Sequence, residues 1–92
     1  MAVEVRVTAV LQRLTGGKKS VESEGSNVDE LLLNLDGSYP GFLRQVKGED
    51  GNLHRFVNIY LNDEDIRYLD KLETPLKSGD VVSILPALAG GV

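Results

Sequence analysis

Alternating residues near the start of the chain constrain its fold more than any other feature. In the stretch AVEVRVTAV, residues 2–10, valine or alanine occupies every second position from Val3, and Glu4, Arg6 and Thr8 stand between them. A period of two places one set of side chains on each face of a β-strand. The stretch therefore predicts a strand with one buried face.

A turn and a returning strand are expected next. In LTGGKKS, the pair Gly16-Gly17 provides residues that adopt positive φ readily, and KSVES has the composition to return antiparallel. We interpret residues 2–23 as a β-hairpin.

The stretch SNVDELLLNLDG predicts the main helix. Ser26 or Asn27 provides the N-cap, with Asp29 or Glu30 three residues on, as in a capping box. Gly37 is the expected end of the helix. The apolar positions that repeat with helical spacing predict its buried stripe: Val28, Leu31, Leu32 and Leu35. The stretch YPGFLRQV predicts a short second helix.

The second half of the chain predicts two more strands, RFVNIYLND and VVSIL, the latter ended by Pro86. Residues 47–52 have loop composition, NDEDI a tight acidic turn, and LETPLKSGD a loop with room for one helical turn. The order predicts an α+β roll: a mixed sheet with the first and last strands central and one main helix on one face. If Val57, Ile59 and Leu61 point to the helix, Phe56 and Tyr60 are exposed on the open face.

Composition narrows the classes of function. The 92 residues carry 10 Lys and Arg against 14 Asp and Glu, a net charge of −4, which argues against a nucleic acid partner. No cysteine is present, so the chain offers no thiolate. Neither a signal sequence nor a membrane-spanning stretch is evident, and a single cytoplasmic domain without a membrane partner is the expectation.

Side chains suited to catalysis or metal binding are scarce. His54 is the only histidine, and local hydrogen bonding at a loop-to-strand junction is its expected role. The acidic run Asp63, Glu64 and Asp65 lacks the alternation and glycine of a calcium loop, so a solvated turn is favoured over a cation site. We expect no enzyme activity, no bound metal and no bound cofactor.

The C-terminal stretch SILPALAGGV offers chemistry that the rest of the chain lacks. A carboxylate on Gly91 would sit on an arm whose last two residues have no Cβ, which suits a narrow channel. A partner enzyme could bring that carboxylate to the α-phosphate of ATP and form an acyl adenylate. The tail therefore predicts a carrier on which other enzymes act.

The whole terminal stretch LKSGDVVSILPALAGG resembles the ubiquitin-like β-grasp sulfur carriers of the ThiS and MoaD families. The resemblance extends from the first strand to Gly91. LTGGKKSV and LHRFVNIYLNDEDIR, residues 53–67, are similar to the actinobacterial branch that donates sulfur for cysteine biosynthesis. The resemblance implies a β-grasp domain over residues 1–86 and a flexible diglycine tail over residues 87–92.

The resemblance also implies the partners. A MoeB/ThiF-type activating enzyme, using ATP and a sulfur donor, would adenylate Gly91 and leave a thiocarboxylate. A pyridoxal-phosphate (PLP)-dependent cysteine synthase would receive the sulfur, and a metalloprotease would release cysteine. The activating enzyme would contact the open sheet face and the tail. The expected contact residues are Phe56, Tyr60, Leu85, Pro86, Leu88, Ala89 and Gly90.

Val92 departs from the pattern, because these carriers end at the second glycine. We expect a JAMM-type metalloprotease to remove Val92 before activation. Three alternatives stay open: the small subunit of molybdopterin synthase, with the tail inserted into the large subunit; a ubiquitin-like modifier joined to lysines through Gly91; and a binding module with an inert tail.

Overall fold

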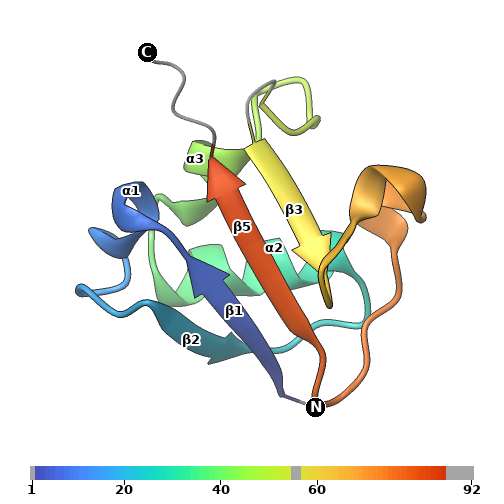
Figure 1. The fold of residues 1–92 in the computed structure, drawn as a ribbon. Helices are drawn as coiled ribbons and strands as arrows, with labels where there is room; N and C mark the ends of the chain where they lie inside the picture. Colours follow the sequence, from blue (N-terminus) through green and yellow to red (C-terminus); the bar gives the residue numbers. More distant parts are fainter. Residues whose placement is uncertain (1, 55–56, 87–92) are drawn as a thin grey trace.

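The computed structural model describes residues 2–54 and 57–86. Its strands form one five-stranded mixed sheet in the order β2-β1-β5-β3-β4, and α2 lies across one face of it (Figure 1). β1 and β5 are parallel neighbours at the centre, as the sequence predicted. The architecture is the predicted ubiquitin-like β-grasp roll. Its elements are β1 (Val3–Val7), α1 (Ala9–Gln12), β2 (Ser20–Ser23), α2 (Val28–Ser38), α3 (Phe42–Val46), β3 (Val57–Leu61), β4 (Glu64–Asp65), the 3-10 turns η1 (Ile66–Tyr68) and η2 (Lys71–Glu73), and β5 (Val81–Pro86).

The predicted hairpin is confirmed in its pairing and wrong in its connection. β1 and β2 are antiparallel, with Val5 opposite Val21. However, β1 ends at Val7, and α1 occupies part of the stretch that the alternation assigned to the strand. Leu11 is fully buried, which a helical turn achieves and an exposed strand extension would not. Gly16 and Gly17 do adopt positive φ, at 69° and 87°.

The main helix, α2, is confirmed with its cap and buried stripe. Asn27 is the N-cap, and its Oδ1 accepts a hydrogen bond from the Glu30 amide at 2.8 Å. The Glu30 carboxylate in turn accepts from the Ser26 amide at 2.8 Å, which completes a reciprocal cap. Gly37 was the wrong end, since the helix continues to Ser38 and Tyr39 is the C-cap. All four predicted stripe residues are buried.

The core fills the space between the sheet and the helices. Phe42, on the predicted short helix α3, is fully buried beside the α2 leucines. Val57 and Ile59 point into this core, as the alternation predicted, whereas Leu61 is only half-buried. A side chain at Gly25 would place its Cβ 2.6 Å from the Leu31 amide nitrogen, so the chain entering α2 passes too close to the helix for any other residue.

The loops of the second half also agree with the sequence. Residues 47–52 form a loop, and Asn62 and Asp63 form the tight turn between β3 and β4 with φ of 51° and 72°. The helical turn expected in LETPLKSGD is η2, whereas β4 and η1 were not predicted: the turn assigned to NDEDI is confined to its first two residues, because Glu64 and Asp65 pair with β3. Within the described ranges, none of the helices has the length and apolar character needed to cross a lipid bilayer.

Candidate functional site

The last strand, β5, is held on both sides. It pairs in parallel with β1, Ile84 lying opposite Val7, and antiparallel with β3, Ile84 lying opposite Ile59. Val82 and Ile84 are fully buried against the helix side of the sheet. Pro86, the last described residue, lies opposite Val57. The chain therefore leaves the domain from a strand that is paired on both sides and buried on one face.

The start of β5 is fixed by a buried carboxylate. Asp80 is 5% exposed; its Oδ1 accepts from Asn62 Nδ2 at 3.1 Å, and its Oδ2 accepts from the Lys77 amide at 2.9 Å. Asn62 Oδ1 accepts from the Val81 amide at 2.9 Å, which ties the β3–β4 turn to β5. The stretch SGD was read from the sequence only as the close of a loop. Its link to the β3–β4 turn was missed, because that link depends on Asn62, 18 positions away.

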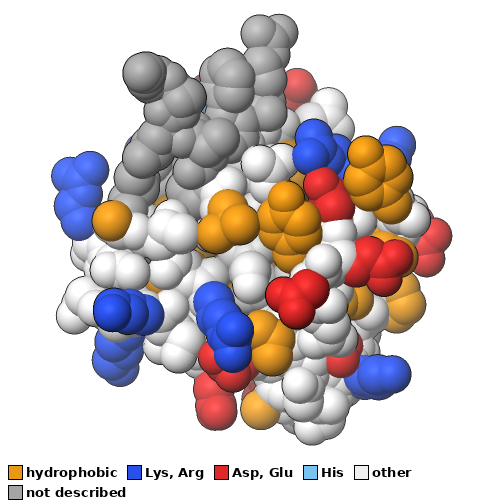
Figure 2. All heavy atoms as spheres, in the orientation of Figure 1, with side chains coloured by type: hydrophobic (Ala, Val, Ile, Leu, Met, Phe, Trp, Pro, Cys, Tyr) orange, Lys and Arg blue, Asp and Glu red, His pale blue; other side chains and the backbone are white. Residues whose placement is uncertain are grey.

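The face of the sheet opposite α2 is open and has an apolar centre. Leu85 is 37% exposed there and lies opposite Asn58, while Tyr60 lies opposite Ser83 and is half-buried. Figure 2 shows hydrophobic side chains in the middle of this face, over β5 and β3. Tyr60 and Leu85, both predicted contact residues, thus share one face next to the point where the chain leaves the domain.

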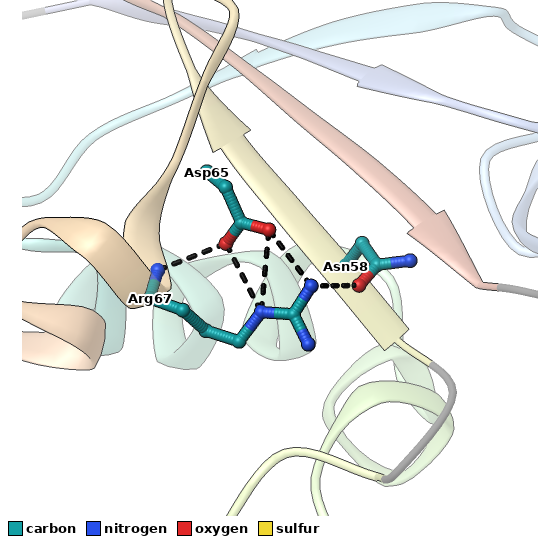
Figure 3. A network of polar contacts seen from close by, with 3 residues as sticks. All are labelled: Asn58, Asp65 and Arg67. Carbon is teal, nitrogen blue, oxygen red and sulfur yellow. Dashed lines mark hydrogen bonds and ion pairs between the residues drawn. The ribbon is translucent and has the colours of Figure 1, made fainter.

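A polar network borders the apolar centre. Arg67 Nη2 donates to Asp65 Oδ2 at 2.8 Å and to Asn58 Oδ1 at 2.8 Å, and the Arg67 amide donates to Asp65 Oδ1 at 2.9 Å (Figure 3). These hydrogen bonds join β3, β4 and η1. The Arg67 side-chain bonds, followed by that of its amide, lower the pKa of Asp65 below its ordinary value.

We expect the substitution Arg67→Met to raise the pKa of Asp65 part of the way toward its ordinary value, because the side-chain hydrogen bonds to the carboxylate would be lost while that of the backbone amide is kept. A carboxyl whose pKa is depressed by folding contributes stability above its unfolded pKa, and that stability is lost as the pH falls through the folded pKa. Carbon-detected NMR titration of the Asp65 carboxyl measures the shift. Arg13→Met, which removes a cation elsewhere, is the control. An unchanged Asp65 titration in Arg67→Met would contradict the assignment.

The alternative chemical sites gain no support from the described residues. His54 Nε2 donates to the Arg44 carbonyl oxygen at 3.0 Å, which is the local role that the sequence predicted. Asp63, on the turn, and Glu64, in β4, are exposed, while Asp65 pairs with Arg67. Across residues 2–54 and 57–86, no group of three or more potential ligands is placed to hold a metal ion.

Several predicted site residues lie outside the described residues. These are Phe56 and, in the tail, Leu88, Ala89, Gly90, Gly91 and Val92. Their roles, and the domain boundary after residue 86, stay predictions. The described residues that bear on them are Leu85 and Pro86, at the end of β5.

Sequence comparison places the chain among small carrier proteins. A family model described as the ThiS family matches residues 5–91. The chain is 43% identical over 93 residues to the sulfur carrier protein CysO of Mycobacterium tuberculosis, covering 99% of this chain and 100% of that protein. It is 32% identical over 94 residues to small archaeal modifier protein 3 of Haloferax volcanii, covering 99% and 100% of the two chains.

Solved structures agree with the sequence comparison. The crystal structure of M. tuberculosis CysO superposes with a TM-score of 0.87 at 41% identity, covering 94% of this chain and 99% of that one. CysO in the Amycolatopsis orientalis BexX/CysO complex superposes with a TM-score of 0.85 at 46% identity, covering 97% and 99%. Similarity at this level extends over the sheet, the helix and nearly the whole length of the chain.

Proposed function

We propose, from the premise that this chain belongs to the ThiS family, that it is a sulfur carrier. In this proposal, a partner enzyme activates the chain at its C-terminal diglycine. The observation that carries the proposal is the 43% identity to a named sulfur carrier over the whole chain. The fold supports it, since β5 anchors the chain at the centre of the sheet immediately before the tail.

The proposed chemistry takes place on Gly91 after removal of Val92. A Gly91 carboxylate oxygen attacks the α-phosphate of ATP, and pyrophosphate leaves. Sulfide then attacks the carbonyl carbon, and AMP leaves with the oxygen. The product is a C-terminal thiocarboxylate. Its sulfur is a nucleophile that requires no cysteine in the carrier, and the chain has none.

The carrier provides a tail and a docking face, whereas the enzyme provides catalysis. Ordering the tail in an active site costs about 1–2 kcal/mol per residue, which contacts made by the folded domain can offset. The apolar centre of the open face around Leu85 and Tyr60 suits that role.

The direct test uses a chain that ends at Gly91, mixed with the activating enzyme of the same organism, ATP and sulfide. We expect the intact mass to rise by the difference between one sulfur and one oxygen atom. Omission of ATP is the control. Failure to gain this mass, in a chain shown to be folded by circular dichroism, would overturn the proposal.

We propose that the sulfur is used for cysteine biosynthesis, because CysO is the relative at 43% identity. Transfer would then require a PLP-dependent synthase that makes an electrophilic aminoacrylate, and a metalloprotease to free the cysteine. Incubating the thiocarboxylated chain with such a synthase and an activated serine tests this step. The thiocarboxylated chain is expected to gain the mass of one aminoacrylate, because the sulfur of the new cysteine is already on the chain, and an unreacted thiocarboxylate would contradict the proposal.

A modifier function is the second candidate, favoured by the 32% identity to a small archaeal modifier protein. In that case Gly91 would be joined to lysine amines of other proteins. Higher-mass conjugates in cell extract that disappear when the diglycine is deleted would support modification. Their absence, together with a detectable thiocarboxylate, would support the carrier function alone.

We expect the substitution Leu85→Asp to weaken docking to the activating enzyme by about 2 kcal/mol, roughly a 30-fold rise in Kd, if Leu85 is an anchor of the interface. A carboxylate placed on the apolar centre would have to be desolvated on docking. Titration calorimetry with the enzyme measures the change. Leu33→Asp, on an exposed leucine of α2 away from the open face, is the matched control. Equal effects of both substitutions would contradict docking through the open face.

A further inference from the structure

The charge of this acidic chain is unevenly distributed. Residues 5–21 contain four of the ten Lys and Arg residues and no Asp or Glu, so this segment has a charge of +4. The rest of the chain has six Lys and Arg against all 14 Asp and Glu, a charge of −8. In Figure 2, Lys and Arg side chains lie over α1 and the turn after it without Asp or Glu among them, whereas both kinds of charge lie on the side of β3 and β4.

Three of the four positive side chains form no ion pair with the residues that the structure describes. Arg6 Nε donates to Glu4 Oε2 at 2.9 Å, so its charge is partly balanced. Arg13, Lys18 and Lys19 are exposed, and no ion pair within the described part of the chain involves them. We refer to these three residues as the basic cap.

The backbone that carries the basic cap is well defined. The hydroxyl of Thr15, a residue 2% exposed, donates to the Lys18 carbonyl oxygen at 2.8 Å, and the Gly17 amide donates to the Gln12 carbonyl at 2.7 Å. The Lys19 carbonyl accepts from the Val7 amide at 2.9 Å, which joins the cap to the end of β1. The backbone of the basic cap is therefore held to the folded domain by hydrogen bonds.

The basic cap lies at the end of the sheet from which the tail leaves. α1 begins two residues after Val7, and Val7 lies opposite Ile84 in the parallel pair of β1 and β5. Leu85 and Pro86 are the next residues of β5. Figure 1 shows α1 at the same end of the sheet as the tip of the β5 arrow. A protein that receives the tail therefore approaches the basic cap as well.

We propose that the basic cap docks against a carboxylate-rich surface of the activating enzyme, beside the entrance for the tail. This inference rests on the proposed function. A protein partner is favoured over a nucleic acid, because Glu4 and Glu22 lie opposite each other on the neighbouring strands β1 and β2 and the rest of the chain carries −8, which would repel phosphates. Against an acidic protein surface, the cap would orient a negatively charged carrier with its tail toward the enzyme.

The double charge reversal Lys18→Glu/Lys19→Glu tests the proposal. We expect it to lower the association rate constant with the activating enzyme about 10-fold at low salt, since steering by charge changes association rates by 10-fold or more. In 0.5 M NaCl, where the Debye length falls to about 4 Å, the difference is expected to shrink to less than about 2-fold. Stopped-flow binding and the rate of ATP–pyrophosphate exchange are the two readouts.

The matched control is Lys71→Glu/Lys77→Glu, which makes the same change in net charge on two exposed lysines away from the cap. We expect it to alter the association rate less than about 2-fold.

Equal effects of the two double variants would overturn the cap proposal while leaving the proposed function intact. Absence of pyrophosphate exchange by the unaltered chain ending at Gly91 would overturn both. Binding of the unaltered chain to double-stranded DNA in 0.15 M salt, lost in Lys18→Glu/Lys19→Glu, would overturn the assignment to an acidic protein.

Discussion

A chain that ends at Gly91 is expected to be adenylated at least about 100-fold faster than one that ends at Val92, since misplacing a reacting group by 1 Å can cost that factor. One additional residue moves the carboxylate by up to about 3.5 Å. It also adds a β-branched side chain with restricted rotamers, where glycine has no Cβ. ATP–pyrophosphate exchange measures the difference under identical enzyme and salt conditions.

Two further experiments test the length and the width of the tail separately. Gly91→Ala in a chain ending at residue 91 keeps the position of the carboxylate and adds one Cβ, so it separates the length of the tail from its width. Treatment of the full chain with a JAMM-type metalloprotease is expected to restore the rate of the chain ending at Gly91. Equal rates for the chains ending at Gly91 and Val92 would contradict the proposal that Val92 must be removed.

Ile84→Ala is expected to destabilise the domain by about 2–5 kcal/mol, the cost of deleting a large apolar side chain from a core. Ile84 is fully buried and lies between Val7 of β1 and Ile59 of β3. Urea denaturation followed by circular dichroism measures the free energy of unfolding.

The adjacent residue provides the control. Leu85 points to the open face, so Leu85→Ala is expected to cost less than about 1 kcal/mol of stability. The two substitutions remove apolar side chains from consecutive positions of one strand, and they differ mainly in which face they affect. Similar losses of stability in both variants would contradict the assignment of the two faces of β5.

The fold could be predicted from the sequence wherever one periodicity extended through a whole element. The leucine stripe of α2 and the alternation in β3 have the spacing of the elements that they form. The error at the end of β1 arose because Ala9 continues the two-residue pattern into a helix. The spacing of Leu11 and Leu14, one helical turn apart, was the signal for a helix.

The candidate site was predicted less completely, because its supporting contacts link distant parts of the chain. Asp80 depends on Asn62, and the Asp65 carboxylate depends on Arg67, which also contacts Asn58. No periodicity specifies such pairs. Leu85 was predicted as a contact residue from the resemblance, and the structure places it on the open face. The basic cap was visible in the sequence as a run without acids, but its place beside the tail required the parallel pairing of β1 and β5.

That parallel pairing has a consequence for synthesis and folding. Glu4 lies opposite Val81, so the first strand of the chain completes its hydrogen bonding only with the last one. Contacts between such distant residues form late and slow the folding of a domain. On the ribosome, the centre of the sheet therefore cannot close until almost the whole chain has emerged. A nascent chain cut short before β5 lacks both the tail and the central strand, so an incomplete copy cannot form a folded domain that competes for the activating enzyme.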